Sequence, residues 1–199
     1  MNNEHVGHAT DATEVSEHPS VARVTSALRG YGHALNIRWL ADSARTAAQA
    51  AQALGIEVGQ IASSLVFAHT RGTRRSDDAP PSDAEGGHIT SPVLVITSGR
   101  HRVDTDALAV ALGISSLGRA DADFVRTWSG FAIGGVAPVG WQSMSPSTHD
   151  LARLTVVVDE ALAHYPEVWA AAGHPHTVFP TTHDELLRMT GGRSLKVGD

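Results

Sequence analysis

Residues 61–67 read Ile-Ala-Ser-Ser-Leu-Val-Phe, and residues 92–97 read Pro-Val-Leu-Val-Ile-Thr. Apolar runs of this length, rich in β-branched residues, are typical of buried strands. Beyond the second run, segments with the patterns of helices and strands alternate along the chain. We therefore expect a mixed α/β domain in which helices cover a central sheet.

The spacing of apolar residues, together with caps and glycine stops, predicts the individual elements. The expected strands are residues 35–40, 61–67, 92–97, 154–158 and 178–181. Asp42 or Ser43 is the expected cap of the second helix. The expected helices include residues 46–54, 105–112 and 121–128, and a stretch over 160–172 that is interrupted at Pro166. A first helix is expected to begin at Pro19 and to end at Gly30. A last helix is expected to begin with a capping box at 182–185 and to end at Gly191.

Composition limits the kinds of protein that the chain can be. Its 199 residues, 42% of them apolar, suit one domain with a single core. No run approaches the ~18 apolar residues of a membrane span, and the first residues lack a secretory pattern, so we expect a cytoplasmic protein without a membrane partner. The absence of cysteine excludes disulfides, thiolate nucleophiles and Cys-ligated zinc. A net charge of −6 argues against a general nucleic-acid binder, so no DNA partner is expected, but it allows a local basic patch that grips one RNA end.

Two polar segments are expected to lie outside the packed core. Residues 1–17 carry no apolar period, which predicts a flexible tail before a single domain over residues 18–199. Residues from about 70 to 91 form a long polar insertion without an apolar anchor, which we expect to be mobile.

Gly134–Gly140 reads Gly-Gly-Val-Ala-Pro-Val-Gly and is the most distinctive loop of the sequence. Glycine admits positive φ and lets another molecule approach the main chain, while Pro138 fixes φ and removes a donor. Such a loop can hold its N–H groups in one outward-facing arrangement that fits a carbonyl oxygen or a phosphate. An ordinary turn after a strand is the alternative interpretation.

Several segments follow one another in a characteristic order: Gln60–Phe67, Pro92–Ile96, Gly99, Arg102–Asp104, Gly134–Gly140 and Val157–Leu162. Their order and approximate spacing resemble the YbaK/prolyl-tRNA synthetase-associated domain family, from about His18 to Gly192. Members of that family are editing domains, free-standing or fused to prolyl-tRNA synthetase, that hydrolyse the ester of a wrong amino acid on tRNA. The resemblance implies a mixed sheet wrapped by helices, the acceptor end of an aminoacyl-tRNA as substrate, and an aminoacyl-tRNA synthetase as a candidate partner.

Hydrolysis of an aminoacyl ester sets few demands on side chains. It needs a positioned water, donors for the developing oxyanion and a pocket that admits the wrong amino acid. The ester is already activated and the terminal ribose hydroxyl can relay a proton, so neither a catalytic triad nor a cofactor is required. In the family's Gly-x-x-x-Pro signature, Gly134, Gly135 and Pro138 are the expected residues for positioning the carbonyl and the water.

Ser63 is a departure from the family pattern, which usually has a lysine at this position that orients the substrate. A hydroxyl can donate one hydrogen bond but lacks the charge of an ammonium. Altered substrate choice, rescue by another cation and lost activity are the three outcomes left open. His101 and Arg102 are candidates for rescue by sequence order alone.

Other residues that are expected to contact the substrate have a structural role as the alternative interpretation. Ser98 is either a pocket residue or a turn serine, and Asp159 either caps a helix or lines the pocket and holds a water. Trp141 could stack on a terminal base or wall the amino-acid pocket. The histidines at 174, 176 and 183 match no known metal pattern, so no metal is expected. The expected substrate-binding set is Ser64, Ser98, Val136, Ala137, Trp141 and Asp159.

Together these features predict a deacylase that acts in trans on tRNA bearing a small misattached amino acid. The alternative, raised by Ser63, is a catalytically silent relative that binds tRNA, a synthetase or a small ligand. Hydrolysis of some other small ester or amide is a third interpretation, which rests on the glycine loop alone.

Overall fold

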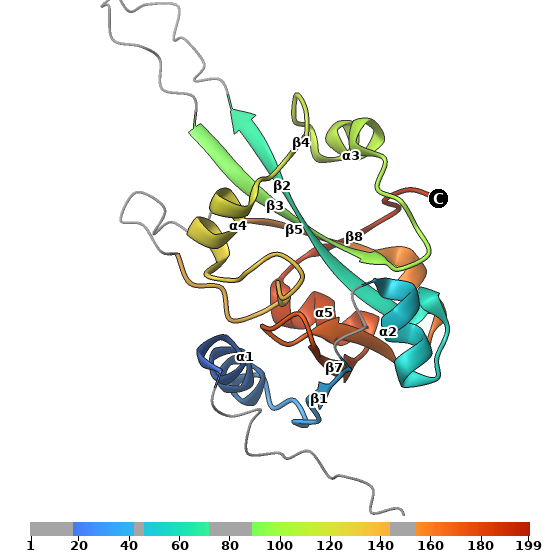
Figure 1. Cartoon of the computed structure of the whole chain (residues 1–199). Coiled ribbons are helices and arrows are strands. Elements are labelled where there is room, and N and C mark those ends of the chain that lie inside the picture. The colour runs from blue at the N-terminus through green and yellow to red at the C-terminus, as the bar shows by residue number, and fades with distance from the viewer. Residues whose placement is uncertain (1–17, 42–45, 72–88, 144–153) are drawn as a thin grey trace, which may run out of the picture.

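The computed structural model describes residues 18–41, 46–71, 89–143 and 154–199 (Figure 1). The expected tail over residues 1–17 and residues 72–88 of the expected insertion lie outside the described residues. Asp42 and Ser43, the expected helix caps, also lie outside them.

A mixed sheet of eight strands forms the centre of the described structure (Figure 1). The strand order is β1-β7-β6-β2-β3-β5-β8, and the short β4 pairs with β2. β3 lies between an antiparallel partner, β2, and a parallel partner, β5. The strands are β1 Arg38–Trp39, β2 Ile61–Arg71, β3 Ile89–Ser98, β4 Gly118–Arg119, β5 Thr155–Asp159, β6 Val168–Ala171, β7 Thr177–Thr181 and β8 Arg193–Leu195.

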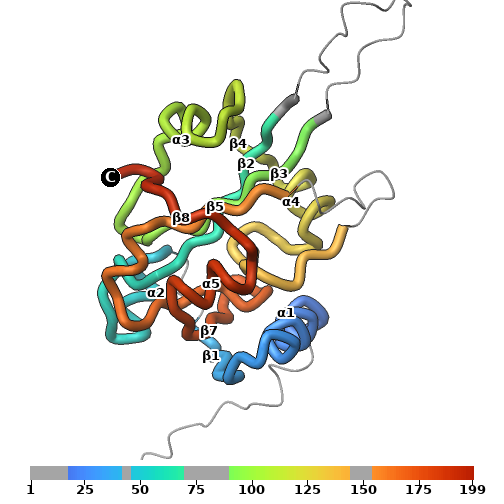
Figure 2. The backbone as a smooth tube through the Cα atoms, turned by 180° about the vertical axis from the view of Figure 1, so that it is seen from behind, coloured from blue at the N-terminus to red at the C-terminus, as the bar shows by residue number. Residues whose placement is uncertain are grey.

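The helices surround this sheet, and both views place α1 and α3 at opposite ends of the molecule (Figures 1 and 2). Thr46 and Thr182 open α2 and α5 with capping boxes, while Gly55 and Gly191 end these helices with φ of 71° and 63°. The helices are α1 Pro19–Gly30, α2 Ala47–Leu54, α3 Thr105–Leu112, α4 Ala122–Ser129 and α5 His183–Thr190, with 3₁₀ turns η2 Val58–Gln60 and η5 Glu160–His164.

The expectation of a helical stretch over 160–172 is wrong. Only Glu160–His164 is helical, as a 3₁₀ turn, and Val168–Ala171 is strand β6 in the interior of the sheet. Pro166 stops the helical turn, and pairing with β2 and β7 then decides the conformation of the next residues.

The ends of the other elements differ less from the expected ones. The expected strand over 35–40 is reduced to Arg38–Trp39, because only these two residues pair with β7. In contrast, β2 and β3 continue their pairing as far as Arg71 and Ile89, so the hairpin is longer than the expected strands. The described fold confirms the mixed α/β class, with helices over both faces of the sheet.

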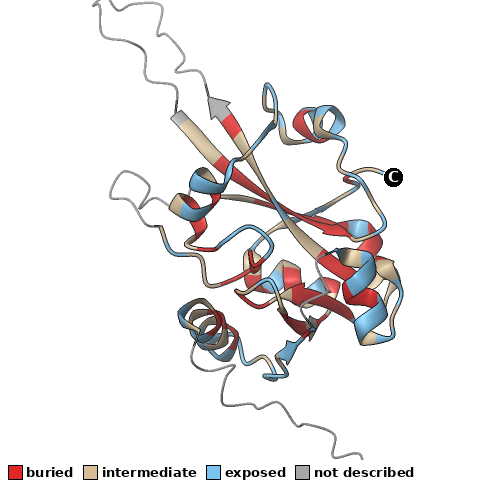
Figure 3. Ribbon diagram, viewed as in Figure 1, coloured by how far each residue is buried: buried red, intermediate tan, exposed pale blue. Residues whose placement is uncertain are grey.

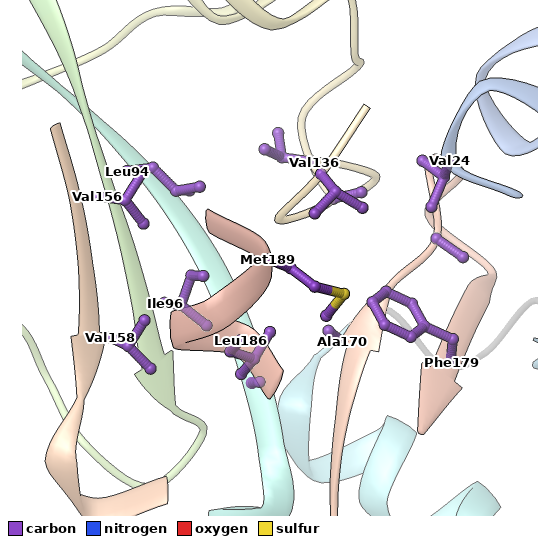
Figure 4. Close-up of a cluster of buried hydrophobic side chains, with 14 of the residues drawn as sticks. Val24, Leu94, Ile96, Val136, Val156, Val158, Ala170, Phe179, Leu186 and Met189 are labelled. Atoms are coloured by element: carbon purple, nitrogen blue, oxygen red, sulfur yellow. The ribbon is translucent and has the colours of Figure 1, made fainter. Parts of the chain in front are cut away.

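The core has apolar clusters on the two faces of the sheet. Leu94 and Ile96 of β3 belong to the large cluster, whereas Val93 and Val95 face the opposite way, against Leu108 of α3. This alternation explains why the strand sequence is apolar throughout. Figure 3 shows the central strands largely buried and the outer helix surfaces exposed. In Figure 4, Val136 of the glycine loop points into the large cluster near Met189 of α5 and Phe179 of β7, so the loop is anchored in the core.

Candidate functional site

The site begins with a gap in the sheet along one edge of β2. β6 pairs with β2 at Ile61 and Ala62, and β4 pairs with it at Phe67 and Ala68. Residues 63–66 therefore have β3 on one side and no strand of the described chain on the other.

Main-chain groups of β2 point into this gap. The carbonyl of Ile61 accepts a hydrogen bond from the Gly99 N–H at 2.8 Å, so the main-chain groups of Ile61 face β3. Successive residues of an antiparallel strand face opposite edges, and the N–H and C=O groups of Ser64 and Val66 consequently point away from β3. The gap thus offers donors and acceptors for a bound molecule.

The loop from Gly130 to Gly140 faces the gap. The Gly135 N–H donates to the Ala132 carbonyl at 3.0 Å, which makes a tight turn with Ile133 and Gly134 at its centre. The φ of Gly134 is 88°, the positive value that a type II turn requires at this position. Ile133 and Gly134 are exposed at the apex, while residues 135–139 are buried, so the turn projects from a rigid base.

Arg23 of α1 holds both ends of this loop. Its Nε donates to the Gly140 carbonyl at 2.7 Å, and Nη2 donates to the Gly130 carbonyl at 3.2 Å. The guanidinium also lies 4.6 Å from the centre of the Phe131 ring. Burial lowers the pKa of Arg23 from its ordinary value, but arginine keeps its charge in proteins. One side chain therefore fixes the span of the loop.

A second segment, residues 173–177, supports the loop from behind. The main chain of His174 lies so close to Gly135 that a Cβ there would be 2.9 Å from the His174 Cα, and Pro175 borders Gly134. The His174 ring contacts the rings of His18 and Trp39, each at 4.9 Å between centroids. Burial, and then the neighbouring His18 and His176, lower the pKa of His174 below its ordinary 6.5, so a neutral imidazole backs the loop at pH 7.

Two cavities among the described residues meet between β2 and the loop. The larger, of about 640 Å³, extends towards His101, Arg102 and Arg119. The smaller, of about 300 Å³, extends towards the apolar side chains of α2, β6 and β7. The residues that border both are Ser64, Leu65, Ile133, Gly134 and Val136. These volumes are in the range of small-molecule sites.

The hydroxyl of Ser64 is an unusual polar group in this site. Its Oγ is buried and has no hydrogen-bond partner among the described residues, although Ser64 borders both cavities. Buried polar atoms in native proteins are nearly always paired. The unpaired hydroxyl is therefore a candidate hydrogen-bond partner for a ligand at this site.

Ser64→Ala is expected to leave the free energy of unfolding unchanged or to raise it by up to about 1 kcal/mol, because it removes an unpaired buried hydroxyl. The same change should weaken substrate binding. Chemical denaturation and the KM for a substrate test the two effects.

Ser129→Ala is the matched control for Ser64→Ala. The buried Ser129 hydroxyl donates to the Val125 carbonyl at 2.6 Å and accepts from the Phe131 N–H at 3.1 Å. Its loss should cost about 1–2 kcal/mol of stability. If Ser64→Ala destabilises the protein as much as this control does, the Ser64 hydroxyl has a structural partner and is not reserved for a ligand.

The structure brings some of the expected site residues together. Ser63 borders the smaller cavity, and Ser64, Gly134 and Val136 border both cavities. Gly135, Ala137 and Pro138 are buried in the base of the loop and border neither cavity. Their expected contribution is therefore to the shape of the loop.

The remaining expected residues lie elsewhere. The Ser98 hydroxyl is buried and donates to the Gly59 carbonyl at 2.8 Å, and the Trp141 indole N–H donates to the Ala137 carbonyl at 2.8 Å. Asp159 caps η5 through the Ala161 N–H and borders a third cavity, of about 460 Å³, which His101 shares. A direct contact of these three residues with substrate stays a prediction.

Sequence reasoning missed three contributors to the site. Arg23 comes from a helix 107 and 117 positions away from the two carbonyls that it binds. Leu65 and Ile133 are 40% and 60% exposed, unusual for large apolar side chains, and both border the two cavities. The alternation within β2 could have singled out Leu65, but no local signal indicates the role of Arg23.

No group of three or more His, Asp or Glu side chains suited to holding a metal ion occurs within residues 18–41, 46–71, 89–143 and 154–199. Within the same ranges, none of the helices has the length and apolarity needed to cross a membrane.

Comparison with known proteins gives the class to which this fold and site belong. The model of the aminoacyl-tRNA editing domain family matches residues 41–189. The chain therefore belongs to the aminoacyl-tRNA editing domain family. The comparison with functionally curated proteins gave no match.

Solved structures agree with this assignment. A crystal structure named a "putative trans-editing enzyme for prolyl tRNA synthetase" is 38% identical, with a TM-score of 0.70 over 92% of this chain and 98% of that one. A scaffold from a study of epitope backbone grafting by computational design is 35% identical, with a TM-score of 0.71 over 91% and 98%. The hypothetical protein APE2540, at 22% identity, TM-score 0.66 and coverage of 89% and 99%, shares the fold.

Proposed function

We propose that this protein is a trans-acting deacylase that hydrolyses the ester of a small amino acid misattached to tRNA. The observation that carries the proposal is the pair of cavities where the unpaired edge of β2 faces the Gly134 turn. An ester carbonyl placed there lies beside main-chain groups of both segments, which can stabilise the developing oxyanion.

The two cavities differ in a way that suits the two halves of an aminoacyl-adenosine. The smaller has apolar walls that include Leu40, Ala50 and Val178, and it suits a short side chain. The larger has Arg102 and Arg119 at its border, where they can attract the phosphates of the tRNA end. An aminoacyl-adenosine bound in this way would have its ester near Ser64 and Gly134, where the cavities meet.

Release of amino acid from tRNAs charged with alanine, serine, threonine, cysteine or proline is the direct test. The control is a double variant, Gly134→Ala with Gly135→Ala, which alters the turn. Hydrolysis of one or a few of these substrates that the double variant loses would support the proposal. No release by folded wild-type protein at high concentration would favour the silent module that binds tRNA, a synthetase or a small ligand.

Ser63→Lys tests whether the missing lysine limits the rate. Ser63 borders the smaller cavity, so a lysine there brings an ammonium to the site. A hydrogen bond from a charged donor exceeds a neutral one by about 1–1.5 kcal/mol, and we expect deacylation to rise roughly tenfold. The measurement is kcat/KM for the best substrate of the panel.

Gln52→Lys adds the same charge at an exposed position of α2 and should leave the rate within about twofold. An equal rise in both variants would indicate general attraction of tRNA. No rise in Ser63→Lys would show that position 63 does not orient the substrate in this protein.

A further inference from the structure

Leu65 and Ile133 are large apolar side chains that lie outside the apolar core. Neither belongs to any of the three apolar clusters formed by residues 18–41, 46–71, 89–143 and 154–199. The two side chains are 40% and 60% exposed. A single exposed leucine or isoleucine is ordinary, but a pair that borders the same cavities is typical of a surface that binds a ligand.

Both residues lie beside the proposed position of the ester. Leu65 follows Ser64, on the stretch of β2 between the segments that pair with β6 and β4. Ile133 precedes Gly134 at the exposed apex of the turn that faces this stretch. Each borders the larger and the smaller cavity, so the two side chains lie where the cavities meet. A molecule that occupies both cavities therefore has to contact them.

Pairing within the sheet explains how Leu65 can be strongly apolar and still exposed. Its cross-strand partner is Val95, which is fully buried against Leu108 of α3. Cross-strand partners share a face of the sheet, so Leu65 points to the same side as Val95. Farther along that face of β2, Ile61 packs in the cluster with α2 and Phe67 in the cluster with α3. Leu65 lies between these two clusters and is left uncovered by both.

The larger cavity combines apolar surface with positive charge. Its other apolar residues near Leu65 include Phe67, Val103 and Leu117. Arg102 and Arg119 border the same cavity, and guanidinium groups bind phosphate oxygens well. A nucleotide has a base with two apolar faces and an anionic phosphate, so its chemistry matches this cavity.

We propose that Leu65 and Ile133 form an apolar clamp for the base of the terminal nucleotide of an aminoacyl-tRNA. The inference rests on the proposed function, because it takes the ester to lie near Ser64 and Gly134. The ribose that carries the ester also carries the base, so the base lies one sugar ring away from the ester, towards the larger cavity. There the base covers the two side chains and removes them from water. Aliphatic side chains offer no hydrogen bonds, so the clamp contributes affinity without reading the identity of the base.

The test compares two stable analogues of the substrate in which an amide replaces the ester. One is 3′-alanylamino-3′-deoxyadenosine, and the other is the same amide on a ribose without a base. Wild-type protein is expected to bind the first at least about tenfold more tightly. Leu65→Ala and Ile133→Ala should each weaken binding of the first about tenfold and leave binding of the second unchanged, because they remove apolar surface that only the base covers.

Val110→Ala is the matched control for the loss of an exposed apolar side chain. Val110 is 82% exposed on α3 and borders none of the three cavities described, so its replacement should leave both Kd values unchanged. Leu65→Met preserves the apolar volume and should stay within about threefold of the wild type. Thermal unfolding shows that each variant is folded, and Ile133→Ala, at the more exposed position, decides the result if Leu65→Ala is unstable.

The outcomes separate the clamp from the proposed function. Equal loss of affinity for both analogues would place the two side chains against the amino acid or the ribose, and it would overturn the clamp. An absence of preference for the analogue with a base in the wild type would overturn it as well, while deacylation by the same protein would leave the proposed function standing. If the wild type shows the preference but releases no amino acid from any charged tRNA, the clamp stands and the proposed deacylase function fails.

Discussion

Gly135→Ala is expected to lower deacylation at least about 100-fold, because a displacement of about 1 Å at a reacting centre costs this much. The alanine Cβ would lie 2.9 Å from the His174 Cα and 3.0 Å from its carbonyl carbon. Main-chain atoms cannot swing aside as a side-chain end can, so the loop must move away from residues 173–177. That movement shifts Gly134 and Val136, which border both cavities.

Gly30→Ala separates this steric effect from the general cost of replacing glycine. No atom lies within 4 Å of the Cβ position at Gly30, and its φ is not positive, so the control should keep full activity. Single-turnover deacylation of the best charged tRNA gives the comparison. Near-normal turnover by Gly135→Ala would show that the loop geometry does not control the reaction.

Phe131→Ala is expected to reduce the free energy of unfolding by about 3–5 kcal/mol, the usual cost of truncating a buried phenylalanine. Phe131 is fully buried at the base of the loop, in the large core cluster, and carries the Arg23 guanidinium over its ring. Its truncation leaves a cavity and removes the cation–π contact. Chemical denaturation followed by circular dichroism gives the midpoint and slope from which this loss is calculated.

Phe131→Leu preserves most of the side-chain volume and should cost less than about 1.5 kcal/mol. The contrast between the two variants reports the cavity rather than the loss of the aromatic ring alone. A loss below about 1 kcal/mol in Phe131→Ala would mean that the base of the loop rearranges to fill the space.

Much of the fold could be predicted because its signals are local. The capping box at Thr182 and the glycine stops at Gly113 and Gly191 depend on neighbours a few residues away, and each appears as expected. Strand β6 could not be predicted in this way, since Val168–Ala171 is also compatible with a helix until β2 and β7 pair with it. The two-residue strand β4 similarly depends on its contact with β2.

In the candidate site, too, some features could be predicted from the sequence and others depend on how distant segments pair. The resemblance identified the β2 segment and the glycine loop as parts of the site, and the cavities bring Ser63, Ser64 and Gly134 together. Sequence alone could not show that residues 63–66 lack a strand on one side, because this depends on where β4 and β6 end. From the sequence, His101 was a candidate to replace the missing lysine by sequence order alone. In the structure, the parallel pairing of β3 with β5 brings His101 against Asp159.

The contacts of Arg23 with both ends of the loop limit how short a segment of this domain can be fused to another protein. The family match begins at residue 41, yet the side chain that ties Gly130 to Gly140 comes from α1, which begins at Pro19. A segment cut at residue 41 and joined to another protein would lose Leu40 from the wall of the smaller cavity and Arg23, which ties the two ends of the loop together. The smallest portable unit of this architecture therefore starts at α1, and a fusion that omits this helix has to supply an equivalent cation from its host.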